Sequence, residues 1–236
     1  MTIPSLMPAV RQGAWIAKRQ IFDWAAKDLN ISVNDLKIET NSVFSISDPQ
    51  KKKTFEELFR AHNVMDVIAV GNREPNPADK SIMPFGAHFA EVEVNTRTGE
   101  VKVVRLVAAN ESGRVINLKT FENQIYGGMT QGLGLALTEK RVLDRATGKM
   151  CNLNLHDYKV PTAMDVPVNH DVVPIDLEDN VCNNVGCKGV GEPGHVPAPA
   201  AIANAIADAI GVHATDGPID NKTILDLLGK GVGHVE

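Results

Sequence analysis

The sequence predicts an α+β protein in which helices pack on a mixed β-sheet. Between Ala87 and Ala109, apolar and polar residues alternate on both sides of a turn at residues 96–99, a pattern typical of a β-hairpin. Residues 121–140 instead repeat apolar side chains every three or four positions, which indicates an amphipathic helix. A chain that carries both periodicities needs sheet and helix faces that cover each other.

The first expected element is a helix over residues 7–29. Apolar side chains recur at helical spacing, so they share one face, at Met7, Val10, Ala14, Ala17, Ile21, Trp24 and Leu29. A face of this length must pack on something. Since the pattern begins almost at the first residue, it also suits a chain that starts partway through a domain.

The next stretch is polar. Residues 41–53 resemble a loop, and Thr54 is placed to cap a short helix that contains Phe55, Leu58 and Phe59. The prolines of residues 71–84 indicate a loop or linker.

The helix predicted over 121–140 contains four interior glycines, which are Gly127, Gly128, Gly132 and Gly134. Each costs about 1 kcal/mol of helix stability relative to alanine. Their presence therefore predicts the close approach of another backbone or of a ligand.

Strands and loops are expected from Leu143 to about Lys188. An alanine-rich helix over 200–210 follows, with Gly211 placed to terminate it, and a last short helix is expected over 222–228.

Composition excludes several classes of protein. The 236 residues carry a net charge of -5, without the basic surface that nucleic acids require. No apolar run approaches the roughly 20 residues that span a bilayer, and the first residues lack the pattern of a signal peptide. Three cysteines are too few for a disulfide framework, so we expect thiols in a reducing cytoplasm.

A glycine-rich stretch over 186–194 carries the densest chemical signal. It matches the spacing G-x-G-x-x-G, but a polar segment precedes it where a dinucleotide site needs a hydrophobic strand. What remains is a turn that presents Glu192 and Lys188 ahead of a helix. Lys188 and the helix dipole would favour the charged form of Glu192, and burial would oppose it. A surface turn whose glutamate caps the helix is the alternative.

Other candidates are weaker. Gln131 lies between the glycine pairs and is a better ligand candidate than Gln124, for which a solvated face suffices. The histidines lack metal-ligand spacing, so we expect no metal held by protein side chains. No G-x-S-x-G motif of a serine hydrolase is present.

Four stretches occur in an order that resembles the C-terminal part of the molybdenum-binding subunit of the xanthine dehydrogenase and aldehyde oxidase family. They are Gly113–Asn117, Glu122–Gly132 (E-x-Q-I-x-G-G-x-x-Q-G), Asp157–Thr162 (D-Y-x-x-P-T), and Lys188–Pro193 (K-G-V-G-E-P) followed by Ala200–Ile206. Together they cover residues 85–228 well. The first helix fits more loosely.

The resemblance implies a role for Glu192 as the active-site base beside molybdenum, where it would deprotonate metal-bound water or hydroxide. It implies contacts to a molybdopterin-type cofactor from Gln131, Gly128, Lys188, Gly189, Val190 and Gly191. The metal would be held through the pterin. The costly glycines near Gln131 would then leave room for a bulky cofactor.

The implied activity is hydroxylation of an electron-poor carbon in an N-heteroaromatic compound or an aldehyde, with water as the oxygen source. Electrons would pass to [2Fe–2S] and FAD groups in partner subunits. A non-catalytic assembly subunit that keeps the fold without the cofactor is the alternative from another class. Retention of Glu192, Gln131 and the glycines together favours the enzyme.

Two departures from the family pattern matter. Glu111-Ser112-Gly113 stands where many members have Asp-Cys-Gly, and Cys187 replaces a small residue, which would alter a substrate pocket or a subunit contact. The chain is also far shorter than the family's molybdenum subunit. Residues 1–236 would thus form part of the second molybdopterin-binding domain. Helix 7–29 would bury its apolar face against a partner chain that carries the rest.

Overall fold

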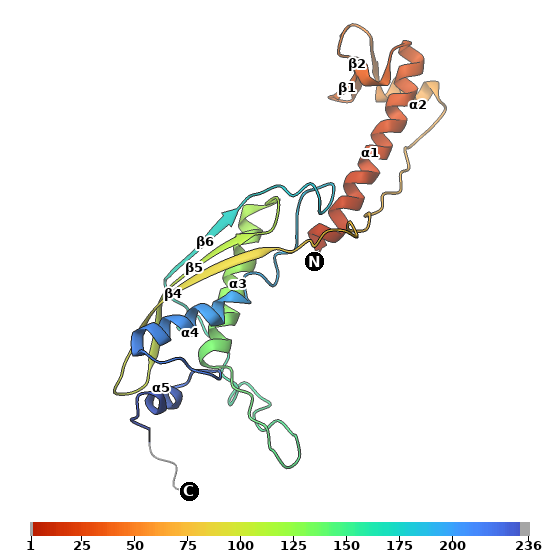
Figure 1. Ribbon diagram of the computed structural model, residues 1–236. Coiled ribbons are helices and arrows are strands. Elements are labelled where there is room, and N and C mark those ends of the chain that lie inside the picture. The colour runs from red at the N-terminus through yellow and green to blue at the C-terminus, as the bar shows by residue number, and fades with distance from the viewer. Residues whose placement is uncertain (1, 232–236) are drawn as a thin grey trace. The chain divides into compact units, whose positions relative to one another are not determined.

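The computed structural model describes residues 2–231 and divides the chain into two compact units. The smaller unit combines residues 2–80 with 180–185, and the larger unit combines residues 81–179 with the chain from residue 186 onward. Figure 1 labels most of the elements of both units. We expect one partial domain over the chain, and that expectation stays a prediction.

The smaller unit packs two helices with a short antiparallel sheet of strand order β1-β2-β3. Its elements are α1 (Thr2–Leu29), a 3-10 turn (Val33–Asp35), β1 (Leu36–Glu39), β2 (Ser42–Ser45), β3 (Lys52–Thr54) and α2 (Phe55–Ala61). The core consists of Phe22, Ala25, Leu36, Val43 and Leu58.

The expected loop over residues 41–53 is wrong, because it contains β2 and most of β3. These strands are short, and a polar side chain takes one of the inward positions of β2. Ser45 is buried and donates a hydrogen bond to the carboxylate of Asp35. A hydroxyl satisfied in this way gives no apolar signal in the sequence.

The first predicted helix is confirmed and extends over Thr2–Leu29. Its C-terminal half contributes Phe22 and Ala25 to the small core. Its N-terminal half leaves large apolar side chains in solvent, with Leu6 58% and Val10 62% exposed. The cap of α2 is also confirmed, since Thr54 and Glu57 form a reciprocal capping box.

The larger unit is built on a sheet of order β4-β5-β6, with β4 antiparallel and β6 parallel to β5. Its elements are β4 (Phe85–Val94), β5 (Val101–Glu111), α3 (Leu118–Leu137), β6 (Asn169–Ile175), α4 (Pro197–Ile210) and α5 (Asn221–Leu227). The predicted α+β class, the mixed sheet and the predicted helices are thereby confirmed, with ends that differ by a few residues.

Helices α3 and α4 pack against each other and against this sheet (Figure 1), and their apolar faces form the main core with β5. The core includes Leu106, Ala108, Phe121, Ile125, Met129, Leu133, Ile202 and Ile206. The register between β4 and β5 shifts at Glu91 and Val92. After this β-bulge, Leu106, Ala108 and Asn110 are the buried positions of β5.

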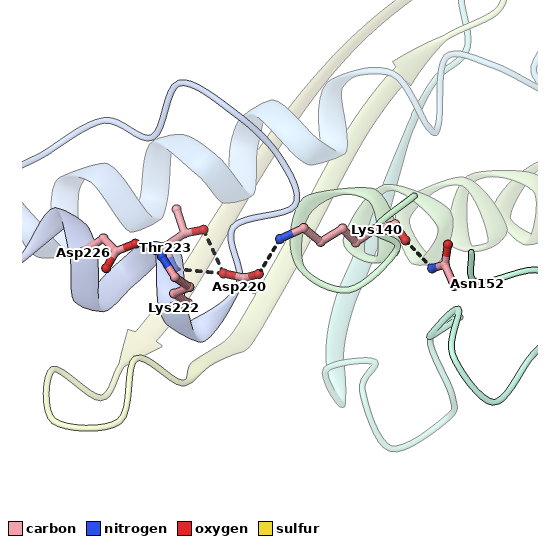
Figure 2. Close-up of polar contacts among 6 residues, drawn as sticks. All are labelled: Lys140, Asn152, Asp220, Lys222, Thr223 and Asp226. Atoms are coloured by element: carbon pink, nitrogen blue, oxygen red, sulfur yellow. Dashed lines mark hydrogen bonds and ion pairs between the residues drawn. The ribbon is translucent and has the colours of Figure 1, made fainter. Parts of the chain in front are cut away.

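A polar network ties the end of α3 to the start of α5 (Figure 2). Lys140 pairs with Asp220, whose carboxylate also caps α5 by accepting a hydrogen bond from the Thr223 amide. The buried Asn152 donates to the Lys140 carbonyl oxygen at 2.7 Å. None of the helices in residues 2–231 is long and apolar enough to cross a membrane.

Candidate functional site

The glycine-rich stretch starts against the end of β5. Gly113 and Cys187 form an isolated antiparallel bridge. The Arg114 amide donates to the Gly186 carbonyl at 2.6 Å, and the Lys188 amide donates to the Ser112 carbonyl at 2.7 Å. The Glu111-Ser112-Gly113 tripeptide, expected to affect a substrate pocket or a subunit contact, thus supports the backbone that leads to Glu192.

The ammonium group of Lys188 is held by two carboxylates at this place. Its Nζ lies 2.9 Å from Glu111 Oε2 and 3.2 Å from Asp179 Oδ2, and its side chain is only 12% exposed. Burial opposes the charge, but the hydrogen bonds to Glu111 and Asp179 outweigh it and raise the pKa of Lys188. We expected Lys188 to favour the charged form of Glu192, but its ammonium group pairs with Glu111 and Asp179 instead.

Glu192 lies on an exposed turn that leads into α4. Its carbonyl oxygen accepts hydrogen bonds from the amides of His195 (2.8 Å) and Val196 (3.1 Å). The N-cap residue of α4 is Val196, and no side chain caps this helix. The alternative in which Glu192 caps the helix is therefore wrong, and its carboxylate faces solvent.

Two of the four helical glycines bring α3 against this turn. A Cβ atom on Gly128 would lie 2.5 Å from the carbonyl carbon of Gly194, and one on Gly132 would lie 2.5 Å from the Ala198 Cβ atom. The close approach of another backbone, one of the two predicted causes, is confirmed at Gly128. At Gly128 and Gly132 the turn and the start of α4 fill the space beside α3, and the predicted contacts to a cofactor stay a prediction.

The remaining two glycines differ from each other. A Cβ atom on Gly134 would collide with Glu139 and Pro161, whereas one on Gly127 would meet no atom within 4 Å. Gly127, Gln124 and Gln131 are all exposed and share a face of α3 at helical spacing. This face, which we call the glutamine face, presents two amide side chains and an uncovered stretch of backbone.

The other predicted cofactor contacts fall on the turn itself. Gly191 is exposed, with open space where a Cβ atom would be, and Val190 is partly buried against the main core. Gly189 is half-buried between Lys188 and Val190. The structure therefore anchors the two ends of the stretch 188–194 and leaves Gly191 and Glu192 accessible.

Two residues of β5 hold this turn, of which sequence reasoning missed Asn110 and did not predict the contact made by Glu111. Glu111 pairs with Lys188, and Asn110 donates a hydrogen bond to the Pro193 carbonyl oxygen at 3.0 Å. Asn110 is a polar residue at an inward position of a valine-rich strand, which would have been a signal of such a contact. Because of the β-bulge, however, alternation counted from Val101 places Asn110 on the outer face of the strand.

Within residues 2–231, no three His, Cys, Asp or Glu side chains are arranged to hold a metal ion. Binding of molybdenum through a pterin stays a prediction.

Comparisons with known proteins agree on a family. The molybdopterin cofactor-binding domain family matches residues 1–167. Glu192 lies outside that match. The aldehyde oxidoreductase molybdenum-binding subunit PaoC of Escherichia coli K12 is 40% identical over 144 residues, 61% of this chain and 20% of that protein. The putative xanthine dehydrogenase molybdenum-binding subunit XdhA of the same organism is 30% identical over 228 residues, 93% of this chain and 29% of that protein.

The fold is likewise similar to a solved structure. Reconstituted CO dehydrogenase from Oligotropha carboxidovorans superposes with a TM-score of 0.82 and 26% identity, covering 97% of this chain and 29% of that one. The chain thus spans between a fifth and three tenths of the length of these proteins. The resemblance to molybdenum-binding subunits of the xanthine dehydrogenase family is confirmed, and the chain belongs to the molybdopterin cofactor-binding domain family.

Proposed function

We propose that this chain is part of the catalytic subunit of a cytoplasmic molybdenum hydroxylase. The enzyme would hydroxylate an electron-poor carbon of an N-heteroaromatic compound or an aldehyde, with water as the oxygen source. The packing of α3 against the Glu192 turn carries the proposal, because it joins the turn that presents an exposed carboxylate to the helix that carries the glutamine face. The names of the relatives, which include an aldehyde oxidoreductase and a xanthine dehydrogenase, support the class of reaction.

The residues present fit a molybdopterin-type cofactor. Such a group offers many hydrogen-bond donors and acceptors and an anionic phosphate. Gln131 supplies an amide, and the open space at Gly127 and Gly191 lets a ligand approach the backbone closely. Gly128 and Lys188 would contribute differently, by fixing the backbone on which these contacts depend.

Glu192 is the general base in this proposal. Its exposed carboxylate would accept the proton from the oxygen nucleophile. When bound, the cofactor supplies the metal that activates the oxygen nucleophile and takes up electrons from the substrate carbon. Partner subunits with [2Fe–2S] clusters and FAD would carry those electrons onward.

A further polypeptide would supply the rest of the molybdenum-binding region. Apolar side chains in the first half of α1 are exposed to solvent. Exposed apolar surface of this kind marks an interaction site. We therefore propose that this half of α1 packs on the missing region.

The first experiment is metal analysis of the complex purified through a tag on this chain. We expect molybdenum near one atom per chain, together with iron and larger partner subunits. A complex that contains its partners and no molybdenum would favour the non-catalytic assembly subunit instead.

The base is tested in the same complex. Glu192→Gln keeps the size of the side chain and removes the proton acceptor, so kcat should fall by about 100-fold or more with molybdenum retained. Glu93→Gln, on the exposed side of β4, is the matched control and should leave kcat unchanged. A fully active Glu192→Gln enzyme with an intact molybdenum content would remove Glu192 from the mechanism.

A further inference from the structure

The turn that presents Glu192 is held from inside the protein by one fully buried side chain. Asn110 is 0% exposed, and its amide Nδ2 donates to the Pro193 carbonyl oxygen at 3.0 Å. That carbonyl follows Glu192 directly in the chain. The contact therefore links the sheet to the residue next to the proposed base.

His88 fixes the orientation of this amide. Its Nε2 atom lies 3.3 Å from Asn110 Oδ1. Because the amide oxygen can only accept, Nε2 must carry the hydrogen, and the Asn110 amino group is left to face Pro193. Burial lowers the pKa of His88, which keeps the ring neutral near pH 7, whereas the hydrogen bond to Asn110 opposes that shift.

Gly86 provides an independent sign that this contact is built into the fold. It pairs with Asn110 across β4 and β5. A Cβ atom on Gly86 would lie 2.6 Å from Asn110 Nδ2 and 3.0 Å from the Pro193 carbonyl oxygen. Only a glycine leaves room here for the amide and the carbonyl together.

Glu111, which follows Asn110 in β5, holds the other end of the segment 188–193. Glu111 pairs with Lys188, and side chains alternate between the two faces of a strand. Adjacent positions at the end of β5 thereby fasten residues 188 and 193. The segment between them is restrained at both ends, although Glu192 itself is exposed.

We propose that Asn110 is a positioning residue for Glu192, which acts by holding the Pro193 carbonyl. The inference rests on the proposed function, because positioning matters only if Glu192 is the base. A small displacement of a catalytic group lowers turnover by as much as about 100-fold. Loss of this restraint should lower kcat more than it changes KM.

The test uses Asn110→Leu in the complex purified through this chain. Leucine is close to asparagine in size, and it removes the amide while leaving the Pro193 carbonyl without its donor. Two quantities are compared with the wild type: hydrogen exchange of the His195 and Val196 amides, which bond to the Glu192 carbonyl, and kcat with KM. Molybdenum content is measured on the same samples.

We expect exchange at these amides to be about tenfold faster and kcat to fall by about 10- to 100-fold, with KM changed less than about threefold and molybdenum retained. Asn152→Leu is the matched control, since Asn152 is also buried and holds a different loop. It should leave both quantities unchanged.

Unchanged exchange in a folded Asn110→Leu complex would overturn the inference, as would a loss of kcat that only follows a loss of molybdenum. If Asn110→Leu does not fold, His88→Leu removes the hydrogen bond that orients the amide. His88→Gln retains a donor, so faster exchange in His88→Leu with rescue in His88→Gln is expected, and equal behaviour of the two would contradict the proposal. Exchange does not require molybdenum, so these results remain distinct from a failure of the proposed function.

Discussion

Residues of one type serve different purposes in this chain according to what lies beside them. Gly127 and Gly128 are adjacent in α3, yet one faces open solvent and the other faces the backbone of Gly194. The same contrast separates Glu192, exposed on its turn, from Glu111, whose side chain is largely buried against Lys188. Residue type alone therefore does not distinguish a packing role from a chemical one.

The glycine pair gives a prediction at this scale. Gly128→Ala should destabilise the protein by about 2 kcal/mol or more, because its Cβ atom would lie 2.5 Å from the carbonyl carbon of Gly194. Gly127→Ala should instead stabilise α3 by up to about 1 kcal/mol, since nothing lies within 4 Å of its Cβ atom. Urea unfolding of both variants checks the difference in sign. Equal effects would mean that the turn does not pack on α3 as described.

At the scale of elements, polar side chains decide how loops are held. Asp165 gathers the loop over residues 159–165 by accepting hydrogen bonds from Lys159 Nζ (2.6 Å), the Thr162 amide (2.7 Å) and the Thr162 hydroxyl (2.8 Å). These hydrogen bonds lower the pKa of Asp165 to about 2, and the one from Lys159 has the largest effect. The loop thus depends on one ionised carboxylate.

This dependence predicts an effect of pH. The pKa of Asp165 is lower in the folded state than its usual 3.8, so its contribution to stability is complete above about pH 4 and is lost as the pH falls toward 2. Asp165→Asn should therefore cost roughly 1–2 kcal/mol at pH 6, a figure reduced because the pair is partly exposed. The difference from the wild type should shrink toward pH 2.5.

Urea midpoints of the wild type and Asp165→Asn across pH 2.5–6 measure this difference. Asp208→Asn, an exposed carboxylate on α4, is the control and should show a smaller effect at every pH. A cost for Asp165→Asn that stays constant down to pH 2.5 would show that the ionised carboxylate is not what holds the loop.

For the whole molecule, local patterns predicted the helices, the hairpin of β4 and β5, and the α2 cap at Thr54. They did not predict that β6 pairs in parallel with β5. This pairing joins distant segments through a long connection, so no short turn in the sequence indicates it. The site divides in the same way. Motifs predict Glu192 and Gln131 as site residues, whereas the hydrogen bond of Asn110 to Pro193, next to Glu192, joins β5 to a turn far along the chain.

The exposed half of α1 leads to the last prediction, which concerns assembly. Leu6, Val10 and Trp15 are 58%, 62% and 61% exposed. If this surface packs on the polypeptide that carries the rest of the molybdenum-binding region, a charge placed in it must be desolvated on assembly. Val10→Glu should therefore reduce recovery of that partner, and of molybdenum, by about tenfold or more in a purification through this chain. The smaller unit itself should keep its stability, because its core uses the other half of the helix.

Lys18→Glu makes a larger change of charge at an exposed polar position of α1 and should leave recovery unchanged. Full recovery of the partner with Val10→Glu would place the interface elsewhere, and an equal loss with Lys18→Glu would mean that charge, rather than burial of an apolar face, controls assembly.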